Sequence, residues 1–522
     1  MALSDTRCAP VQSLLRYSPA MTAILIVAAC GASVADIDLW GHLRFGLDAL
    51  ARGSIATRDP YAYSIPGLPW VSHEWLSEII FAWMYAKLGV LGLKLVRLAC
   101  AAAMIICLAG AVGETGARIE VQLAVLIAAA IALAPEMEFR PQAFSYALLA
   151  GTMWLLAREN FRPRAPLWLA IPMLALWSNL HGGFVTGLAA LGIFTACVGL
   201  ADLRAGRGLA RALRPALVTV ASAAASLATP YGFGTWISVL RTLSHPPMMN
   251  EIVEWKPLPA AMIAIWHMPG WALLFDVIVV LLFAGLIAAV AAAPRGGDFP
   301  LVAIAAVMIT AGVSALRNVP LGIIGCVTPL TRHLGLALGA VPGAQRARSG
   351  AAPQRGRSGP WAETTLAILA VFVAIKIGVF SRRMEIPFTF PAGAVAFMRQ
   401  HQLSGNILCK FSWDDYVLYH CWPECHVFLD TRYEMIYPDR IAREYEDFYH
   451  DRADAAGVLN GYPNNYVMLD PAAPAVALMN SSPGWKLIYQ DPVALLYARA
   501  DSAAASLAVV NAARPAAPRE FP

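Results

Sequence analysis

The sequence predicts an all-α polytopic membrane domain of about 11 transmembrane helices, followed by a small C-terminal α/β soluble domain. Hydrophobic residues make up 58% of the 522 residues and charged residues only 14%, whereas about a quarter of a soluble domain is charged. Apolar segments long enough to cross a bilayer recur between residues 20 and 380 and then stop. We therefore expect most of the chain to be surrounded by lipid.

The apolar segments set the predicted spans. They lie at 20–35, 94–113, 119–135, 143–157, 166–180, 184–201, 214–230, 271–293, 299–316, 319–338 and 361–380. The first segment ends Ser33-Val34-Ala35, which resembles a signal-peptidase site. We interpret it as an uncleaved first span, because the later spans already commit the chain to the membrane.

One further apolar stretch, residues 74–89, is short and carries three charged residues. If this stretch does not cross the bilayer, the arginine-rich loops near 158–164, 204–214 and 346–357 fall on the same side as the basic N-terminus. That arrangement follows the positive-inside rule. We therefore predict a helix lying against the outer leaflet or dipping into it. The N-terminus is then cytoplasmic and the C-terminal domain periplasmic in a bacterial inner membrane.

The predicted domain organisation follows from these spans. Residues 1–380 form the transmembrane domain, with an outer loop at 36–93 and a cytoplasmic linker loop at 341–360 that is rich in Gly, Ser, Pro and Arg. Residues 385–500 form the periplasmic α/β domain, and residues 501–522, rich in Ala and Pro, are expected to be disordered. Within the α/β domain we expect helices at 392–401, 414–421 and 438–449, and strands at 406–411, 427–430, 466–470, 485–488 and 494–499.

Charge and cysteine content say less about function than the apolar segments do. The net charge of +5 is small, and arginines in short loops are explained by membrane topology, so we expect no nucleic-acid partner. In the C-terminal domain, Cys421-Trp-Pro-Glu-Cys425 can close a short disulfide in an oxidising compartment or remain a pair of buried thiols.

The most informative polar residues open the first outer loop. Asp36 and Asp38 follow the first span directly, and His42 follows Asp38 by about one helical turn. If a helix begins there, Asp38 and His42 share a face. Carboxylates beside a membrane are costly to desolvate, which makes them functional candidates. Asp36 or Asp38 can act as a general base towards a hydroxyl acceptor, or ligate a divalent cation such as Mg²⁺ or Mn²⁺ that neutralises a phosphate leaving group. Alternatively, the two residues only end the first helix in water.

Other polar residues are predicted on the same outer side. His73 and Glu74 begin the in-plane helix and can be metal ligands, proton carriers or caps. Arg140 and Arg317 lie in outer turns and suit a phosphate or pyrophosphate, although each alone is also typical of an interfacial anchor. His181 precedes two glycines that allow close approach of a backbone or ligand.

Two motifs of the C-terminal domain combine acidic and aromatic residues. They are Trp413-Asp414-Asp415-Tyr416 and Phe428-Leu-Asp430-Thr-Arg432. Such residues suit contact with sugar hydroxyls, but helix capping and core packing explain them better.

Four segments carry a resemblance to a known superfamily. They are Asp36-x-Asp-x-Trp-x-His-x-Arg44, Trp70-x-x-His-Glu-Trp-Leu, Asn179-x-His-Gly-Gly and Glu251-x-x-Glu-Trp-x-Pro257. Together with the predicted architecture they resemble an uncharacterised bacterial group within the GT-C superfamily of polyprenyl-phosphate-sugar-dependent membrane glycosyltransferases. The resemblance implies that an aspartate shortly after the first span is catalytic, which maps onto Asp38 or Asp36. The chain departs from the superfamily by having Asp-x-Asp where Asp-Glu or Asp-Asp is commoner.

The resemblance implies a hexosyltransferase-type enzyme that moves a sugar from a polyprenyl-phosphate carrier to a periplasmic acceptor. His42, His73, Glu74, Arg140, His181 and Arg317 are its expected substrate-binding residues. Two alternatives come from other classes. A lipid or polysaccharide transporter should place polar pairs or broken helices in mid-span, with an internal repeat. A non-catalytic assembly protein of cell-envelope glycan synthesis should depend on its C-terminal domain rather than on the outer loop.

Overall fold

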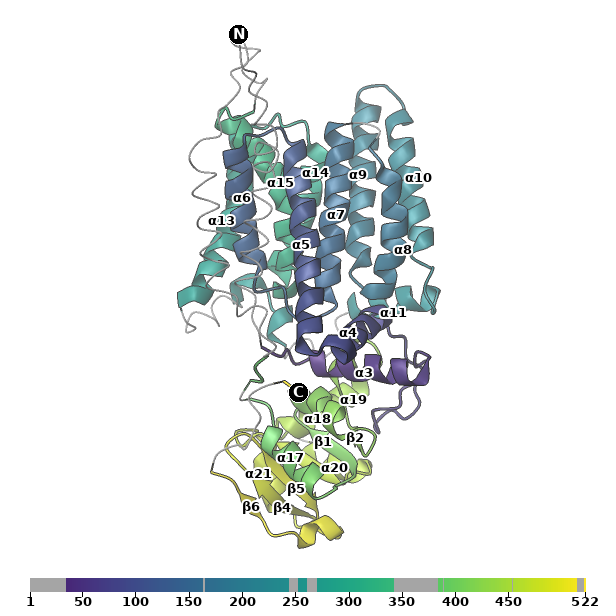
Figure 1. The fold of residues 1–522 in the computed structure, drawn as a ribbon, viewed down its shortest axis with the longest axis vertical. Helices are drawn as coiled ribbons and strands as arrows, with labels where there is room; N and C mark the ends of the chain where they lie inside the picture. The colour runs from purple at the N-terminus through teal and green to yellow at the C-terminus, as the bar shows by residue number, and fades with distance from the viewer. Residues whose placement is uncertain are drawn as a thin grey trace, which may run out of the picture. The chain divides into compact units, whose positions relative to one another are not determined.

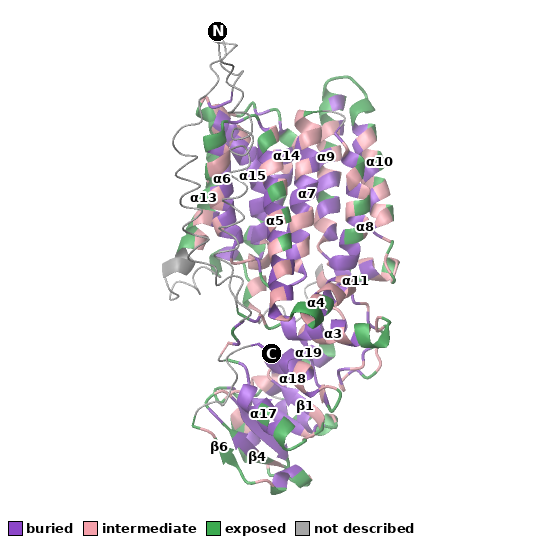
Figure 2. Ribbon diagram, viewed as in Figure 1, coloured by how far each residue is buried: buried purple, intermediate pink, exposed green. Residues whose placement is uncertain are grey.

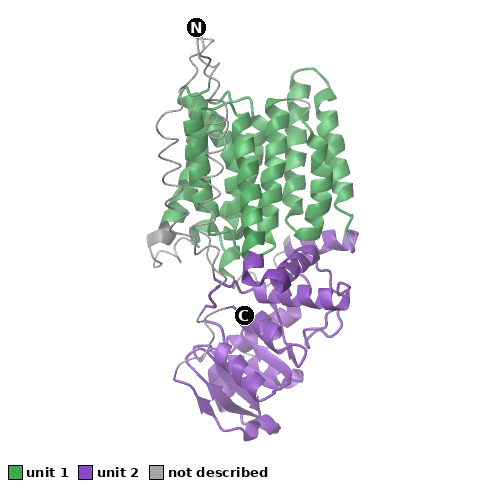
Figure 3. Ribbon diagram, in the orientation of Figure 1, with its two compact units in different colours: residues 1–32, 94–229, 252–381 green, residues 33–93, 230–251, 382–522 purple. Residues whose placement is uncertain are grey.

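A computed structural model describes residues 34–162, 165–243, 252–260, 270–341, 384–387, 389–452, 454–513 and 521–522. These residues group into two compact units, coloured separately in Figure 3. The helical unit contains the described residues of Lys94–Thr229 and Ile252–Ser381. The α/β unit contains those of Ser33–Leu93, Pro230–Glu251 and Arg382–Pro522.

The helical unit is built from long apolar helices, labelled in Figure 1. They are α5 (Val90–Glu114), α6 (Ile119–Leu133), α7 (Gln142–Phe161), α8 (Ala170–Leu180), α9 (Phe184–Arg204), α10 (Ala210–Ala225), α13 (Gly270–Ala292), α14 (Phe299–Ser314) and α15 (Val319–Ala337). Short 3-10 turns η1 (Leu167–Leu169), η3 (Val253–Trp255) and η4 (Leu316–Asn318) connect them. Each of these helices coincides with a predicted span. The first and last predicted spans fall outside the described residues, apart from residues 34 and 35.

Four of the described helices are long and apolar enough to cross a membrane: Val90–Glu114, Phe184–Arg204, Leu274–Ala292 and Leu316–Ala337. Three shorter apolar helices, Ile119–Leu133, Leu167–Leu180 and Phe299–Ser314, accompany them. The predicted membrane-embedded helical domain is therefore confirmed, whereas the total of 11 spans stays a prediction.

Helix α15 forms the centre of the helical unit. It packs against α6, α7, α13 and α14, and most of its residues are buried, as the purple ribbon in Figure 2 shows. Peripheral helices instead expose large apolar side chains, for example Leu217 and Val220 on α10 and Ile287 on α13. Exposed apolar side chains on helices whose backbone groups are paired internally suit contact with lipid.

The α/β unit contains a six-stranded mixed sheet. Its strands are β1 (Gly405–Cys409), β2 (Cys425–Val427), β3 (Tyr466–Leu469), β4 (Trp485–Gln490), β5 (Leu495–Arg499) and β6 (Val510–Asn511), in the order β2-β1-β3-β5-β4-β6. The β1 strand runs parallel to β2 and β3, whereas β5 is antiparallel to β3 and β4. The helices are α17 (Ala392–Gln400), α18 (Asp414–Cys421), α19 (Asp439–Tyr449), α20 (Ala455–Gly461) and α21 (Ala475–Ser481). The predicted α/β class of the C-terminal domain is confirmed.

The loop at residues 36–93 belongs to this α/β unit. It forms α3 (Leu39–Arg52) and α4 (Trp75–Leu88), which pack on each other, while α3 also packs on α18. Between the two helices, Ala62 pairs in parallel with Val427, so the loop extends the sheet beyond β2. The backbone N–H of Tyr63 donates to the Val427 carbonyl at 3.0 Å. Helix α11 (Phe233–Leu243) joins the same unit.

The predicted domain boundaries stay a prediction. By contacts between residues, the described structure groups residues 36–93 with the C-terminal domain. The ordered C-terminal domain also extends past residue 500, because η8 (Ala503–Ser506) forms a 3-10 turn and β6 pairs with β4. The predicted linker at 341–360 lies outside the described residues except for residue 341.

Cys421 ends α18 and Cys425 begins β2. Both side chains are buried, and neither takes part in a disulfide in the described structure.

Candidate functional site

The α/β unit positions the polar residues of the first loop through the close packing of α3 on α4. Gly46 faces the backbone of Glu78, and a Cβ added at Gly46 would overlap the Glu78 carbonyl group. Only a glycine lets the two helix backbones approach this closely. The consequence is that His42, one turn before Gly46, lies beside the side chain of Glu78.

Asp36 and Asp38 occupy the start of α3 but have different surroundings. The Asp36 carboxylate accepts a hydrogen bond from the backbone N–H of Asp38 at 3.0 Å, so it caps the turn that begins the helix. Asp38 is the N-cap residue, yet its side chain makes no capping hydrogen bond. The backbone N–H of His42 bonds to the Asp38 carbonyl at 3.0 Å. The expected helix is present, and Asp38 and His42 stand one turn apart on it.

His42, Glu74 and Glu78 form a cluster at the α3–α4 contact. The Nδ1 atom of His42 lies 3.9 Å from Oε2 of Glu74 and 3.7 Å from Oε1 of Glu78. Burial alone would lower the pKa of the His42 imidazole, but Glu78, Glu74 and Asp38 together raise it to about 9. The cluster thus concentrates negative charge around one imidazole.

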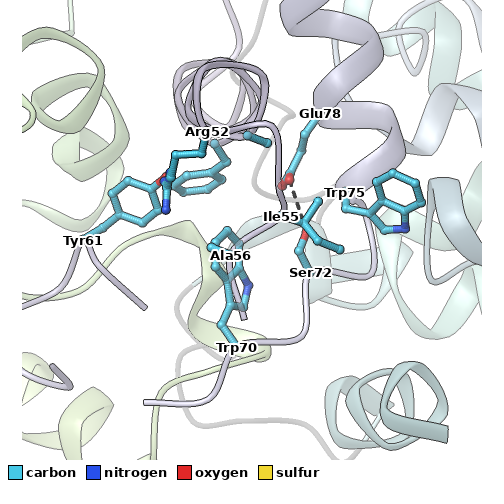
Figure 4. A pocket seen from close by; sticks show the side chains of 10 residues that line it. Arg52, Ile55, Ala56, Tyr61, Trp70, Ser72, Trp75 and Glu78 are labelled. Atoms are coloured by element: carbon cyan, nitrogen blue, oxygen red, sulfur yellow. Dashed lines mark hydrogen bonds between the residues drawn. The ribbon is translucent and has the colours of Figure 1, made fainter. Parts of the chain in front are cut away.

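Two neighbours hold the carboxylates of this cluster. The Ser72 hydroxyl donates to Oε2 of Glu78 at 3.2 Å, drawn as the dashed line in Figure 4. His73 Nε2 lies 3.8 Å from Oε1 of Glu74. Three of the predicted substrate-binding residues, His42, His73 and Glu74, therefore come together in the structure.

Helix α18 of the C-terminal domain contributes a fourth acidic side chain to this region. Asp415 is fully buried against Gly41 of α3, where any added Cβ would overlap its carboxylate. The Thr431 hydroxyl donates to Oδ2 of Asp415 at 2.5 Å, whereas Oδ1 has no hydrogen-bond partner. Burial raises the pKa of the Asp415 carboxyl well above its usual range, and the nearby charges of Asp430 and Asp38 add to that effect.

Sequence reasoning assigned Asp415 to capping and core packing and therefore missed its place beside α3. The available signal was the pair of consecutive carboxylates at 414 and 415 beginning a helix that also buries apolar residues. Glu78 was also missed as a site residue. Its spacing of one helical turn from Glu74 put both carboxylates on the same face.

A buried arginine joins the first loop to the C-terminal domain. The guanidinium of Arg432 donates from Nη2 to Oδ1 of Asp59 at 2.6 Å and to Oδ2 of Asp430 at 2.5 Å. The rings of Phe45, Tyr61 and Trp70 surround it, with their centroids 4.7, 5.1 and 4.4 Å from its central carbon. Such cation–π contacts and bidentate pairing are the surroundings in which arginine is retained inside a protein.

A small pocket lies between α3, α4 and the segment that joins them, and it has room for about one water molecule. Figure 4 shows its lining, which comes from α3, α4 and the segment between them. The lining residues are Phe45, Ala49, Arg52, Ile55, Ala56, Tyr61, Trp70, Ser72, Trp75 and Glu78. The described pocket is too narrow to hold a sugar ring.

In the helical unit, Arg140 and Arg317 lie among side chains from the two connecting turns η3 and η4. Arg140 forms ion pairs with Glu138 at 3.1 Å and with Glu254 at 2.9 Å. The guanidinium of Arg317 stacks over the ring of Trp255, 4.1 Å from its centroid. The Glu254-Trp255 motif thus contacts both predicted arginines.

His181 lies in the helical unit at the end of α8. Its Nδ1 accepts a hydrogen bond from the backbone N–H of Gly183 at 2.9 Å and lies 2.7 Å from the Ser145 hydroxyl. The indole N–H of Trp177 donates to the same hydroxyl oxygen at 2.6 Å. Because Nδ1 accepts, Nε2 carries the proton of the neutral ring. A Cβ on Gly183 would overlap Ser145, which explains the need for glycine there.

Comparison with solved structures identifies the fold. The oligosaccharyltransferase of Archaeoglobus fulgidus, tethered with an acceptor peptide containing the NVT sequon, superimposes with a TM-score of 0.54 at 10% identity, over 87% of this chain and 69% of that one. The same protein, AglB, in complex with an inhibitory peptide and a dolichol-phosphate gives a TM-score of 0.52 at 12% identity, over 88% and 70% of the two chains. Its complex with Zn and sulfate also gives 0.52 at 12% identity, over 87% and 68%.

The chain has the GT-C fold. This confirms the resemblance in fold that the four sequence segments predicted. No protein-family model matches the chain, and no curated protein matches its sequence. At identities of 10–12% the likeness concerns fold alone.

Metal binding by Asp36 and Asp38 stays a prediction. Among the described residues, the group with ligand atoms close enough together for one ion is His42, Glu74 and Glu78, whose atoms all lie within 4.8 Å of one another.

Proposed function

We propose that this protein is an integral membrane glycosyltransferase that moves a sugar from a polyprenyl-phosphate carrier to a periplasmic acceptor. The observation that carries the proposal is the placing of Asp38, within a GT-C fold, at the start of a helix that the C-terminal domain packs against. The dolichol-phosphate bound by the structurally similar oligosaccharyltransferase supports a lipid-linked phosphate as the donor class.

Asp38 is the proposed catalytic base. Its carboxylate accepts the proton of the acceptor hydroxyl while that oxygen attacks C1 of the sugar. The bond between C1 and the phosphate oxygen breaks, the polyprenyl phosphate leaves, and the configuration at C1 is inverted. Asp38 suits this role better than Asp36 because His42 stands one helical turn after it, on the same face of α3.

Asp38 also acts within a strongly acidic environment. Glu74, Glu78 and Asp415 surround the first turn of α3. His42, His73 and Glu74 are then proposed to orient the sugar hydroxyls.

Arg140 and Arg317 are proposed to bind the phosphate of the carrier. Both side chains belong to connecting turns of the helical unit rather than to mid-helix positions. Arginine forms bidentate, charge-assisted hydrogen bonds with phosphate. Because Arg140 is paired with Glu138 and Glu254, a phosphate has to exchange with those carboxylates.

The proposed setting is a bacterial inner membrane with 11 spans, a cytoplasmic N-terminus and a periplasmic C-terminal domain. The placing of arginines in predicted cytoplasmic loops supports this orientation. His181 then lies at the periplasmic end of α8, and its protonated Nε2 can donate to a substrate oxygen.

The test is a transfer assay on the purified full-length protein in proteoliposomes. A panel of polyprenyl-phosphate sugars carries a radiolabel in the sugar, and periplasmic membrane extract supplies acceptors. We expect polyprenyl phosphate to be released and label to appear on the acceptor. Movement of intact donor across the bilayer would instead indicate a transporter. A protein that needs residues 385–500 in vivo but tolerates every outer-loop substitution would be a non-catalytic assembly protein.

A further inference from the structure

We infer that His42, Glu74 and Glu78 form a binding site for one divalent transition-metal cation, of the class of Zn²⁺ or Mn²⁺. The inference goes beyond the proposed transfer reaction. Metal binding at this site can be tested without the sugar donor or the acceptor. It also moves the metal site from the predicted Asp36 and Asp38 to residues on both helices of the first loop.

The first argument is the spacing of the three ligand atoms. His42 Nδ1 lies 3.7 and 3.9 Å from the facing carboxylate oxygens of Glu78 and Glu74. These separations are too long for hydrogen bonds. Ligand atoms bound to one ion at about 2.0–2.2 Å each lie roughly 3–4 Å apart. The three side chains are therefore spaced as ligands around one ion are spaced, and not as partners in direct hydrogen bonds.

The second argument is the state of the His42 imidazole. Its Nδ1 atom is buried and has no hydrogen-bond partner, although it faces two carboxylates. Buried polar nitrogen atoms are nearly always hydrogen-bonded or coordinated. A cation between His42 and the carboxylates would satisfy this atom with the neutral imidazole as its ligand.

The third argument is the burial of the two carboxylates. Glu74 is 7% exposed and Glu78 is 6% exposed, and both approach the same imidazole nitrogen. Burying two carboxylates side by side is costly, and positive charge at the point between them lowers that cost. A divalent cation supplies two positive charges at the point where both side chains converge.

The surrounding residues support a built site rather than a loose acidic patch. The Ser72 hydroxyl holds the second oxygen of Glu78, and His73 approaches the second oxygen of Glu74. Hydrogen bonds to the outer atoms of ligands are typical of metal centres. The glycine at position 46 fixes the distance between the helices that carry the ligands.

The ligand set also selects the class of ion. An imidazole together with two carboxylates suits Zn²⁺ or Mn²⁺, whereas Mg²⁺ and Ca²⁺ prefer oxygen ligands alone. With three protein ligands, a fourth coordination position is left for a substrate oxygen or water. Such an ion would supply positive charge for a phosphate leaving group.

The experiment measures metal binding by the full-length protein in detergent. After treatment with a chelator and its removal, Zn²⁺ and Mn²⁺ are added separately and bound metal is counted by mass spectrometry and titration calorimetry. We expect one ion per chain. We expect Glu78→Gln to weaken binding by more than about 100-fold, because changes to outer-shell partners alone cost 10–100-fold. The matched control is Glu424→Gln, which removes an exposed carboxylate of the same unit.

A spectroscopic measurement on the unmodified protein keeps the test independent of how the variants fold. With Mn²⁺ bound, pulsed electron paramagnetic resonance should detect coupling to one imidazole nitrogen, and His42→Gln should remove that coupling. Absence of stoichiometric binding to the wild type would overturn the inference. Equal binding by wild type and Glu78→Gln, or a bound ion without nitrogen coupling, would also overturn it. Because no substrate is present, failure of the proposed transferase activity would leave these results intact.

Discussion

Arg432 donates a hydrogen bond to Asp59 at 2.6 Å across 373 residues of sequence, and this contact joins the loop at residues 36–93 to the C-terminal domain. Both side chains are buried, with Asp430 as the second carboxylate partner of the guanidinium. The pair fixes the segment that leads from α3 towards α4. The C-terminal domain is therefore part of the structure that positions Asp38 and His42.

Removing one carboxylate of this buried cluster should destabilise the α/β unit. Asp59→Asn leaves the charge of Arg432 with a single partner, and breaking buried pairs costs about 3–5 kcal/mol. Hydrogen-exchange mass spectrometry of the full-length protein should show faster exchange both in the first loop and in residues 425–432. The control is Glu444→Gln, which breaks an exposed ion pair with Arg440 and should leave exchange unchanged. Equal exchange in both variants would show that Arg432 does not join the two segments.

Gly46 should tolerate no side chain. Gly46→Ala places a Cβ against the Glu78 backbone, so we expect α3 and α4 to separate and His42 to move away from Glu78. Transfer activity should fall by at least about tenfold, since small misplacements of catalytic groups have large effects on rate. Gly192→Ala is the control, because a Cβ at that helical position meets open space. Full activity of the Gly46→Ala variant would contradict the described helix contact.

Asp414 should make the stability of the α/β unit depend on pH. Its carboxyl is buried, and burial raises its pKa well above its usual range, although the Cys409 thiol donates a hydrogen bond to it. A group whose pKa is raised on folding stabilises the fold below its unfolded pKa and loses that contribution as the pH rises through its folded pKa. Asp414→Asn keeps the shape and removes the titration. The melting temperature of the wild type, relative to this variant, should therefore decrease between pH 4 and pH 8, whereas a relative increase would indicate an ionised carboxylate.

The ion pairs of Arg140 should compete with donor binding. Arg140→Gln removes a charge-assisted contact worth about 1.5–3 kcal/mol, so we expect KM for the lipid-linked donor to rise by roughly 10–100-fold. Glu254→Gln should instead lower KM, because the guanidinium exchanges its partner more readily. Arg158→Gln, in the last turn of α7, is the control and should leave KM unchanged. A lower kcat with unchanged KM in Arg140→Gln would argue against a phosphate contact.

Local patterns in the sequence were sufficient for much of the fold. The apolar runs predicted each described helix of the helical unit, and helix 414–421 of the C-terminal domain was predicted with its observed bounds. Hydrophobic period and segment length determine such elements without reference to distant residues. The helix at Trp75–Leu88 was likewise predicted from its apolar stretch, while its relation to the membrane stays a prediction.

Long-range pairing explains what sequence reasoning missed. Nothing local to Asp59 indicates that Arg432 is its partner, and nothing local to Ala62 indicates that it pairs with Val427. Asp415 was missed because a carboxylate at a helix start has an ordinary capping explanation. The candidate site was predicted as a set of loop residues, but its completion by α4 and α18 depends on tertiary packing.

Asp38 is the residue on which the proposed mechanism depends most directly. The decisive measurement is single-turnover transfer by the purified wild type, Asp38→Asn and Asp36→Asn with the same polyprenyl-phosphate sugar and acceptor. We predict that Asp38→Asn reduces the rate of sugar transfer by at least about 100-fold, the usual contribution of a general base, while Asp36→Asn retains measurable activity because its role is to cap α3. Wild-type rates in both variants would contradict the account.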